Sequence, residues 1–328
     1  MNAIGLDLGG TNLKGGIVSE EGEVYRFTIT PSGVPEGPEK ILENLVTLSR
    51  IFLKKAGEMG ISISGIGVAT PGIIDPSFGG ITGGADNLPG WRGTAFMKTL
   101  YQEFKLPIHA HNDVTAITLG ELRYGAGKGK KNVILAAFGT GIGGGIVIDG
   151  KLYGGHTGYG GEIGHMAIRA DGYRCSCGIR GCWEEYASIR GILRTARDHI
   201  SKDNMKESTI HIKINNKIEN LTPKVLFDSA REGDRLALQI VDEVGNNTAI
   251  GIGNLINIFN PELVIVGGGI ALAGEIFLES IKKHIHLWTL KDSRDAAEIV
   301  LAKLGEKAGV VGASSLVFEN INRLNLEF

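Results

Sequence analysis

The chain has 328 residues, of which 42% are hydrophobic and 21% are charged, and its net charge is −2. This composition is typical of a soluble globular protein with two domains of ordinary size. The charge balance leaves no basic excess for nucleic-acid binding, and no apolar run is long enough to span a membrane. The N-terminus lacks the basic and apolar regions of a signal peptide, so a cytoplasmic protein is expected.

Apolar periodicity and turn residues predict alternating strands and helices in the first 125 residues. Ile41, Leu45, Leu48 and Phe52 recur every three or four positions, which predicts an amphipathic helix packed on a sheet. Shorter apolar runs between turn residues predict strands. The expected strands are Ala3–Leu8, Lys14–Ser19, Gly65–Ala69 and Ile108–Ala110, and the expected helices are Pro38–Met59, Thr94–Phe104 and Val114–Tyr124.

The segment Gly125–Lys131 is rich in glycine and lysine, as is typical of a linker between domains. Beyond it, Ser201–Asn220 is polar and is expected to be irregular. Because strands and helices alternate along the whole chain, the predicted class is α/β. The expected strands after the linker are Val133–Phe138, Gly145–Ile148, Leu263–Val266 and Ile299–Ala302, and the expected helices are Ser188–Ile200, Leu236–Phe259, Glu275–Leu287 and Val310–Asn320.

A short internal repeat predicts that the two halves share one architecture. Gly10–Val18 and Gly139–Val147 are identical at six of nine positions. Each copy follows an apolar strand and leads into a second strand that ends in an acid–glycine turn. Gene duplication explains this pattern, and each lobe would then present a strand–turn–strand hairpin. A chance similarity between glycine-rich turns is the alternative.

The two repeated turns have the chemistry of phosphate-binding loops. Thr11 and Thr140 supply hydroxyls, the neighbouring glycines offer clustered backbone N–H groups, and Lys14 adds a positive charge. Two such turns facing each other could hold a polyphosphate from both sides, whereas one alone would be read as an ordinary hairpin. Gly267–Gly269 ends a strand just before a helix, at the edge where α/β sheets bind ligands.

Two nucleotide-binding motifs match through glycine content alone. Gly139–Gly144 fits the dinucleotide fingerprint, but that fingerprint opens a helix, and here a strand follows. Gly145–Lys151 resembles a P-loop, but Leu152 stands where the magnesium-binding Ser or Thr belongs. Neither match predicts a site.

All three cysteines lie within eight residues of one another, at Cys175, Cys177 and Cys182, and His165 precedes them by ten residues. Three thiolates and one imidazole are the ligands of a closed, structural zinc site. A disulfide would leave one cysteine over, a redox Cys-Xaa-Xaa-Cys motif is absent, and a role as buried apolar residues would not explain the clustering. The sequence therefore predicts bound zinc. Acidic residues flank this loop and could form a polar binding surface with the histidine.

Seven motifs are spread along nearly the whole chain: Leu6–Asn12, Ala69–Gly72, Asn87–Trp91, Asn112-Asp113, Gly139–Gly143, Gly161–His165 and Cys175–Glu184. By these motifs the chain resembles the ROK family of repressors, open reading frames and sugar kinases, and most of all its bacterial-type glucokinases. The cysteine motif is the most specific of the seven. Only six residues precede Asp7, so the DNA-binding arm of the family's repressors is not expected.

The resemblance implies an actin-like, hexokinase-type fold with two duplicated lobes and a cleft between them. The first lobe would comprise residues 1–125, completed by the C-terminal helix 310–328, and the second lobe, 126–309, would carry the zinc loop and the nucleotide site. The implied activity is ATP-dependent phosphorylation of glucose at the 6-hydroxyl, with Asp113 as the general base. From the residues alone, Asp113 could equally be a helix N-cap. A homodimer or homotetramer is also implied.

The resemblance also assigns binding residues. His165 would bind zinc through one ring nitrogen and the sugar through the other, so zinc would be structural. Asp7 would hold Mg²⁺ through water, or else its side chain would hydrogen-bond the backbone of its own turn. Glu185 is expected to be solvated. The implied sugar contacts are Gly72, Asn87, Asn112, Asp113, Glu162, His165 and Glu184. The implied phosphate contacts are Gly10, Thr11, Asn12, Lys14, Thr140 and Gly141, with Gly268 and Gly269 near the nucleoside.

Three alternatives to a glucokinase remain open. The first is another kinase of the family, acting on N-acetylmannosamine, fructose, allose or mannose. The second is a sugar-sensing regulator, although a sensor has no use for the base and metal–phosphate site formed by Asp113, Lys14 and Asp7. The third is a polyphosphate-using kinase, which would be expected to carry a more basic channel than Lys128–Lys131 provides. The expected partners are a small sugar and a nucleotide, not nucleic acid or a membrane.

Overall fold

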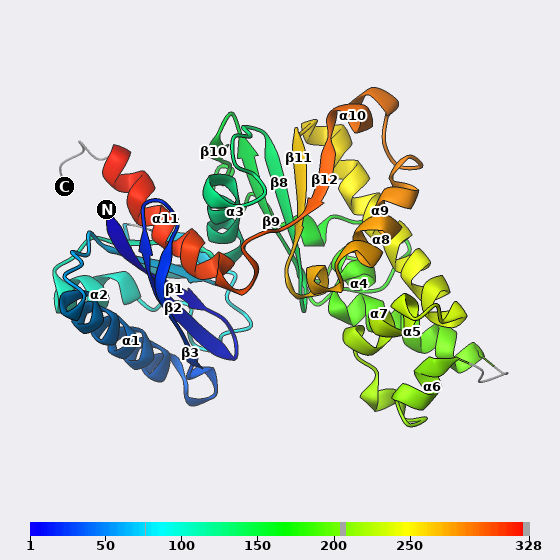
Figure 1. The fold of residues 1–328 in the computed structure, drawn as a ribbon, viewed down its shortest axis with the longest axis horizontal. Coiled ribbons are helices and arrows are strands. Elements are labelled where there is room, and N and C mark those ends of the chain that lie inside the picture. The colour runs from blue at the N-terminus through cyan, green and yellow to red at the C-terminus, as the bar shows by residue number, and fades with distance from the viewer. Residues whose placement is uncertain (76, 204–207, 324–328) are drawn as a thin grey trace. The chain divides into compact units, whose positions relative to one another are not determined.

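A computed structural model describes residues 1–75, 77–203 and 208–323 (Figure 1). The chain forms two compact units. The first contains Met1–Gly129, Gly154–Gly160 and the chain from Lys303 onward, and the second contains Lys130–Tyr153 and Gly161–Ala302. Each unit is built on a five-stranded sheet with helices, which confirms the predicted α/β class. Residues 324–328 of the predicted C-terminal helix lie outside the described residues.

The sheet of the first unit has the strand order β3-β2-β1-β4-β7. Its strands are β1 (Asn2–Leu8), β2 (Asn12–Ser19), β3 (Val24–Pro31), β4 (Ile66–Thr70) and β7 (Ile108–Asn112). Strands β1 and β2 form an antiparallel hairpin, whereas β1, β4 and β7 are parallel. Helix α2 (Phe96–Phe104) and a small hairpin of β5 (Ile73–Asp75) and β6 (Gly80–Gly83) complete the loops beyond β4.

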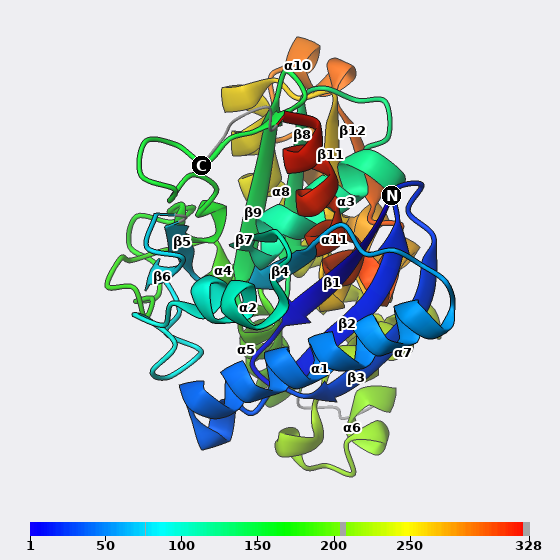
Figure 2. The ribbon, with the colours of Figure 1, turned by 90° about the vertical axis from the view of Figure 1, so that its left-hand side faces the viewer.

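Helices cover both faces of the first sheet (Figure 2). Helix α1 (Pro38–Glu58) packs on one face through Leu45, Leu48 and Phe52, which are buried as the periodicity predicted. Each such side chain contributes on the order of 1.5–3 kcal/mol when it is fully buried. Helices α3 (Asp113–Tyr124) and α11 (Ala308–Arg323) pack against each other, and α11 packs on β1 and β4.

Helix α11 approaches β1 and β4 so closely that only glycine fits on the strands. A Cβ atom on Gly5 would lie 2.1 Å from the carbonyl oxygen of Val310. A Cβ atom on Gly67 would lie 1.8 Å from the carbonyl oxygen of Ala313. Both obstacles are helix backbone, which cannot move aside as a flexible side chain can. The last helix of the chain is therefore an integral layer of the first unit.

The sheet of the second unit repeats the topology of the first, with the order β10-β9-β8-β11-β12. Its strands are β8 (Val133–Phe138), β9 (Ile142–Ile148), β10 (Lys151–Leu152), β11 (Leu263–Gly267) and β12 (Glu298–Leu301). As in the first unit, the first two strands form an antiparallel hairpin and the later ones add in parallel. The duplication predicted from the repeated turns is therefore confirmed.

Helix α8 (Arg235–Phe259) is the longest apolar element in the second unit, and α9 (Glu275–Ile285), α7 (Pro223–Arg231) and α5 (Ile189–Lys202) pack against it. The prediction that Ser201–Asn220 is irregular was wrong in part, since α6 (Thr209–Lys213) forms within it. Ile210 and Ile214 are buried in the core of the unit, and Asp234 accepts hydrogen bonds from the start of α6. Residues 204–207 of this segment lie outside the described residues.

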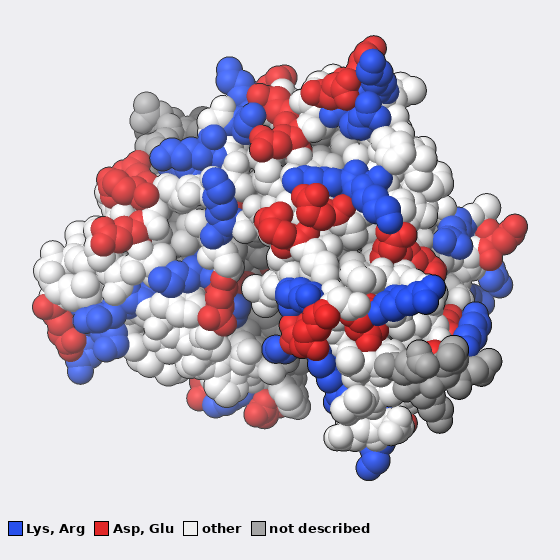
Figure 3. Space-filling view, turned by 45° about the vertical axis from the view of Figure 1, so that its right-hand side comes forward, with Lys and Arg blue, Asp and Glu red and all other residues white. Residues whose placement is uncertain are grey.

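Charged side chains of both signs are interspersed over the face seen in Figure 3. Within residues 1–75, 77–203 and 208–323, no helix combines the length and apolar character needed to cross a lipid bilayer.

The contact between β4 and α11 makes a stability prediction. Gly67→Ala should lower the free energy of unfolding by at least about 2 kcal/mol, because the added methyl overlaps helix backbone. Gly57→Ala is the matched control, since Gly57 is helical and its Cβ position has open space. We expect that control to be neutral or stabilising by about 0.5–1 kcal/mol. Thermal or urea unfolding measures both, and equal effects would contradict the proposed packing constraint.

Candidate functional site

The carboxyl ends of β1, β4 and β7 bring three predicted site residues to one edge of the first sheet. In the parallel registers, Asp7 lies beside Ala69, and Thr70 lies beside Asn112. Asp113 follows directly as the first residue of α3. In open α/β sheets, ligands bind outside the carboxyl ends of the strands. This edge is therefore the candidate site of the first unit.

Asn112 caps helix α3, and this corrects the interpretation of Asp113 as the N-cap. The Asn112 Oδ1 atom accepts hydrogen bonds from the N–H groups of Val114 at 3.0 Å and Thr115 at 3.3 Å. Asp113 lies one residue inside the helix, where its Oδ1 atom accepts from Val114 at 2.9 Å. His111 Nδ1 accepts from the Asn112 N–H, and burial lowers the pKa of His111. The backbone that carries Asp113 is thus fixed on both sides.

Asp7 is an acid of this edge with a raised pKa. Burial, together with the nearby charge of Asp113, raises the pKa of Asp7 from 3.8 to about 6, against the opposing charge of Lys14. The Lys14 ammonium also lies 3.5 Å from the carbonyl oxygen of Glu306. A Cβ atom on Gly309 would lie 2.2 Å from the Asp7 carboxyl carbon, so α11 covers this carboxyl closely. Carboxylates at a site with excess negative charge suit a hard cation such as Mg²⁺.

The first repeated turn is held by backbone and serine contacts. The Gly9 N–H donates to the carbonyl of Asn12 at 2.9 Å. Ser32 donates its N–H to the carbonyl of Thr11 and its hydroxyl to the carbonyl of Gly10. Thr11 and Asn12 are exposed. The turn is therefore rigid, with its carbonyls already bonded and its polar side chains available to a ligand.

Gly72 and Asn87 lie on loops around the β5–β6 hairpin. Gly72 has a φ of 108°, and a Cβ atom there would lie 2.8 Å from the carbonyl oxygen of Gly83, so glycine is required. Asn87 is exposed on a turn that leads to the fully buried Trp91. The indole N–H of Trp91 donates to the Thr70 hydroxyl at 3.0 Å. This bond attaches the Asn87 loop to the carboxyl end of β4.

In the second unit, the predicted metal ligands converge. The ligand atoms of His165, Cys175, Cys177 and Cys182 all lie within 4.8 Å of one another. The Cys177 and Cys182 sulfurs are 3.6 Å apart, and Cys175 Sγ is 3.8 Å from His165 Nδ1. In a tetrahedral site with zinc–sulfur bonds of about 2.3 Å, sulfurs are about 3.8 Å apart. Donor types and spacing are compatible with zinc.

Burial raises the pKa of the Cys175 and Cys182 thiols. Cation binding at this cluster must therefore displace protons. The orientation of His165 also suits two roles, because Nδ1 faces Cys175 while Nε2 lies 4.0 Å from Glu162 Oε2. Glu162 is about half exposed, whereas His165 is one-third exposed. The Nδ1 edge of the imidazole thus faces the cysteine cluster, and the Nε2 edge faces the half-exposed carboxylate of Glu162.

Glu184 lies between the cysteine cluster and the second repeated turn. Its Oε1 atom accepts from the Cys175 thiol at 3.0 Å and from Arg190 at 3.3 Å. A Cβ atom on Gly141 would lie 2.7 Å from Glu184 Oε2. Trp183, fully buried, donates its indole N–H to the carbonyl of Asn247 on α8 and so fixes the preceding backbone.

Glu185 is not solvated, which corrects the expectation from the sequence. Its side chain is only 3% exposed and binds the guanidinium groups of Arg190 and Arg194. Arg190 bonds Glu184 as well, so it connects the two acids. Arg190 lies in the first turn of α5 and Arg194 in the second, and no sequence motif identified them. Adjacent acids followed by basic residues at helical spacing were the only available signal.

The second repeated turn is tied to helix α5. The Gly139 N–H donates to the carbonyl of Gly141 at 2.9 Å, and the Ile189 N–H donates to the carbonyl of Gly139 at 2.9 Å. Thr140 is exposed at the tip of the turn. Like the first turn, this turn is closed by a backbone hydrogen bond and carries an exposed threonine, but it is one residue shorter between the paired strand ends.

Gly268 and Gly269 follow β11, and Gly268 lies beside the end of β8. Gly268 has a φ of 81°, and a Cβ atom there would lie 2.4 Å from the carbonyl oxygen of Phe138. A pocket of about 400 Å³ adjoins these glycines, between the short helix η4 (Gly269–Ala273) and α7. Phe227 and Arg231 line its α7 side. The pocket offers apolar and charged surface, with Asp228 beside the basic residues, next to Gly269.

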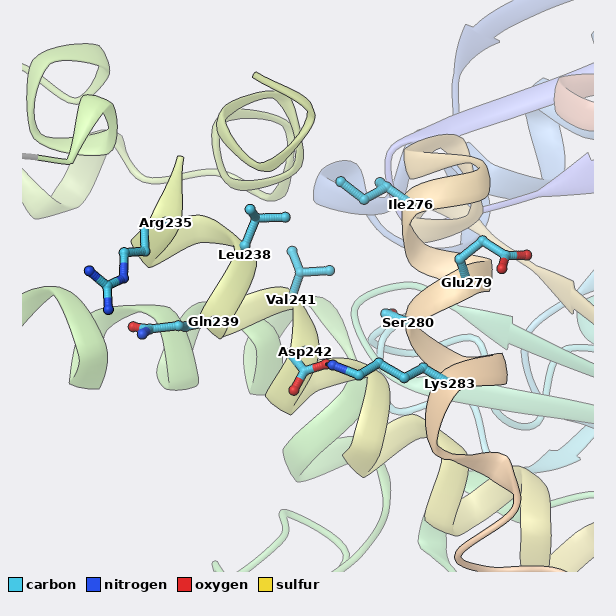
Figure 4. A pocket seen from close by; sticks show the side chains of 9 residues that line it. All are labelled: Arg235, Leu238, Gln239, Val241, Asp242, Ile276, Glu279, Ser280 and Lys283. Carbon is cyan, nitrogen blue, oxygen red and sulfur yellow. The ribbon is translucent and has the colours of Figure 1, made fainter. Parts of the chain in front are cut away.

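A second concave surface lies between α8 and α9 and has a volume of about 540 Å³ (Figure 4). Leu238 and Asp242 line it from α8, and Ile276 and Lys283 line it from α9, with Lys283 bonded to Asp242. The residues predicted to form the site do not line this groove, so it lies outside the candidate site.

Comparison with known proteins places the chain in a family. The profile of the ROK family matches residues 3–320. The chain belongs to the ROK family. It is 36% identical over 321 residues to a glucokinase from Thermotoga maritima, with 98% of each chain covered. A xylose repressor from Caldicellulosiruptor bescii is 33% identical over 318 residues, covering 97% of this chain and 78% of the repressor.

Solved structures agree with this assignment. A ROK family glucokinase from Streptomyces griseus, in complex with glucose and AMPPNP, has a TM-score of 0.83 and 32% identity, covering 97% of this chain and 100% of that one. A ROK hexokinase from Thermus thermophilus has a TM-score of 0.78 and 28% identity, covering 98% of this chain and 100% of the hexokinase. The predicted actin-like, hexokinase-type fold is confirmed.

The cysteine cluster predicts a metal content. We expect about one zinc per chain in the purified protein, and its loss in Cys177→Ser, with a fall in melting temperature of several degrees. Ser176→Ala, in the same loop but outside the ligand set, should retain both metal and stability. Elemental analysis and thermal unfolding measure these outcomes. A stable wild-type protein without metal would show that the cluster is not a zinc site.

The raised pKa of Asp7 predicts a pH-dependent stability difference. Ionising Asp7 costs the folded state more than the unfolded state, so wild-type stability falls as the pH rises from about 4 through about 6. Relative to the wild type, Asp7→Asn should therefore gain roughly 3 kcal/mol above pH 6.5 and little at pH 4. Urea unfolding without nucleotide or Mg²⁺ measures this. A difference that stays constant with pH would be inconsistent with the burial argument.

Proposed function

We propose that this chain is an ATP-dependent sugar kinase that phosphorylates glucose at its 6-hydroxyl. The observation that carries the proposal is the pair of carboxylates, Asp7 and Asp113, at the carboxyl edge of the first sheet. Full-length similarity to glucokinases from Thermotoga maritima and Streptomyces coelicolor, at 36% and 32% identity, supports it.

Asp113 is proposed as the general base. Its carboxylate accepts the proton of the 6-hydroxyl while that oxygen bonds the γ-phosphorus of ATP. The bond from the γ-phosphorus to the bridging oxygen breaks, and ADP leaves with the electron pair. Asp7 lies close enough to Asp113 for the two charges to repel. Proton transfer to Asp113 relieves that repulsion, so the neighbouring acid favours the step.

Mg²⁺ and the phosphates have matching groups in the chain. Asp7 would hold the metal, because its buried charge lacks full compensation from Lys14. The metal neutralises phosphate charge when it is bound. The exposed threonines and turn N–H groups suit phosphate oxygens. The proposed phosphate contacts are Gly10, Thr11, Asn12, Lys14, Thr140 and Gly141. The nucleoside would lie near Gly268 and Gly269, next to the pocket between η4 and α7.

The proposed sugar contacts are polar groups with fixed orientations. Carboxylates accept from sugar hydroxyls, and amide and imidazole groups both donate and accept. Zinc would have a structural role, holding His165 so that Nε2 faces the sugar, while Arg190 holds Glu184. The proposed set is Gly72, Asn87, Asn112, Asp113, Glu162, His165 and Glu184.

A coupled ADP-release assay tests the function and the sugar preference together. We expect turnover with ATP and glucose to exceed that with mannose, fructose, allose, N-acetylglucosamine and N-acetylmannosamine. A higher rate with another of these sugars would assign a different substrate. Binding of a sugar by calorimetry without ADP release would instead favour a sensor, the second candidate function, which the similarity to a xylose repressor supports.

In the same assay, Asp113→Asn should lower kcat by at least about 1,000-fold, because the amide cannot accept the hydroxyl proton. Glucose affinity by calorimetry should change by less than about tenfold, since the amide keeps the shape and hydrogen-bonding capacity of the site. Asp86→Asn, an exposed acid near Asn87, is the control and should retain full activity. Near-normal turnover in Asp113→Asn would remove Asp113 from the role of base.

A further inference from the structure

A buried acid of helix α3 has a set of partners that the proposed chemistry does not use. Glu121 is fully buried. One of its carboxylate oxygens, Oε1, accepts from the backbone N–H groups of Lys303 at 2.9 Å and Leu304 at 2.8 Å. The other, Oε2, accepts from the N–H of Ala126 at 2.8 Å. Burying a carboxylate is costly unless such bonds compensate it, so three backbone donors are a specific arrangement.

These donors lie where the chain passes between the two units. The N-terminal segment of the first unit ends at Gly129 and its C-terminal segment begins at Lys303, and these two crossings are distinct from those at either end of Gly154–Gly160. Glu121 therefore holds the last anchored residues before the chain leaves the first unit and the first residues after it returns. Its own backbone carbonyl also accepts from Gly125 and Gly127. Both crossings are fastened to one side chain.

The opposite ends of both crossings are fastened in the second unit. Glu262 Oε2 accepts from the N–H groups of Lys131 at 2.7 Å and Asn132 at 2.9 Å. The Ala302 N–H donates to the carbonyl of Val266 at 2.9 Å, as part of the sheet. In the first crossing only residues 128–130 lie between the anchors. In the second crossing the anchors are adjacent, because Ala302 belongs to one unit and residue 303 to the other.

We propose that Glu121 is the positioning residue of a hinge between the two units. It confines their relative motion to Lys128–Lys130 and to the bonds on either side of the peptide joining Ala302 and Lys303. Gly129 suits this role, since its φ is 83° and nothing crowds its Cβ position. The Gly154–Gly160 segment, which also joins the units in sequence, contains four glycines among its seven residues and can follow such a motion.

The hinge would be coupled to catalysis through helix α3. Asp113 and Glu121 lie eight residues apart on α3, about 12 Å along its axis. A helix of this length is stiff, so the anchor of the two crossings and the proposed base are held at a fixed separation. This consequence rests on the proposed function, whereas the hinge itself does not.

Hydrogen exchange tests the hinge without reference to activity. In the wild type, we expect the amides of Ala126, Lys303 and Leu304 to be protected and those of Gly129 and Lys130 to exchange rapidly. Glu121→Gln keeps one acceptor oxygen and replaces the other with a donor, so at least one crossing loses its bonds. Exchange at Ala126, or at Lys303 and Leu304, should rise at least tenfold. Faster exchange across the whole first unit, or none, would overturn the proposal.

Glu262→Gln is the matched control at the other end of the first crossing. It should speed exchange at Lys131 and Asn132 and leave Lys303 and Leu304 unchanged, because the second crossing has its own anchor. If Glu121→Gln fails to fold, the wild-type exchange pattern together with this control still decides the hinge positions. Rapid exchange at Lys303 in the wild type would overturn them.

Kinetics then test the coupling. Glu121→Gln should lower kcat about tenfold, because the hinge sets the reacting geometry. The affinity for adenosine, measured by calorimetry, should stay within about twofold, because the proposed nucleoside contacts Gly268 and Gly269 both lie in the second unit. Unchanged kcat with raised local exchange would make Glu121 purely structural and overturn the positioning role. If the wild type is not a kinase, the exchange experiment still stands, so the two failures are distinguishable.

Discussion

The proximity of Asp7 and Asp113 at a covered sheet edge is the constraint on which the first unit depends. Burial under α11, which approaches Asp7 closely at Gly309, raises the pKa of Asp7 most, and the charge of Asp113 adds to the effect. That fit requires glycine at Gly5 and Gly67 on the strands beneath. The tight packing of the last helix and the electrostatic cost at Asp7 are thus two results of one arrangement. A site that favours a cation costs the protein stability when no cation is present.

The second unit reaches a comparable rigidity by different means. Its sheet repeats the strand order of the first, and its turn also carries an exposed threonine. Here the loop beside the turn brings His165 and three cysteines together, and Arg169 and Trp183 of that loop bond Asn247 of α8. Glu184 connects that cluster to the turn, and Arg190 keeps the acid in place. The two sheets share one topology, whereas the elements that hold the repeated turns differ.

The sequence could predict what depends on local pattern. The hairpin repeat, the periodic helix α1 and the cysteine cluster are each encoded within short segments. Glu185 was expected to be solvated because its burial depends on arginines of the next helix. Ile210 and Ile214 are buried in an otherwise polar segment because α7 and the core of the second unit provide an apolar surface for them. The N-cap of α3 is Asn112 and not Asp113, because composition does not reveal a one-residue shift in where a helix begins.

Glu121 illustrates the strongest limit on such prediction. As one acid on an amphipathic helix it has no pattern, and its partners are backbone groups contributed by segments far apart in the chain. Backbone donors also explain why a carboxylate is suited to this position. An ion pair would fix two side chains to each other, whereas a carboxylate with two acceptor oxygens fixes the path of two backbones at once. Because its partners are backbone N–H groups, Glu121 is hard to identify from the sequence. For the same reason it can anchor both crossings without restricting the backbone torsions of the residues that join the units.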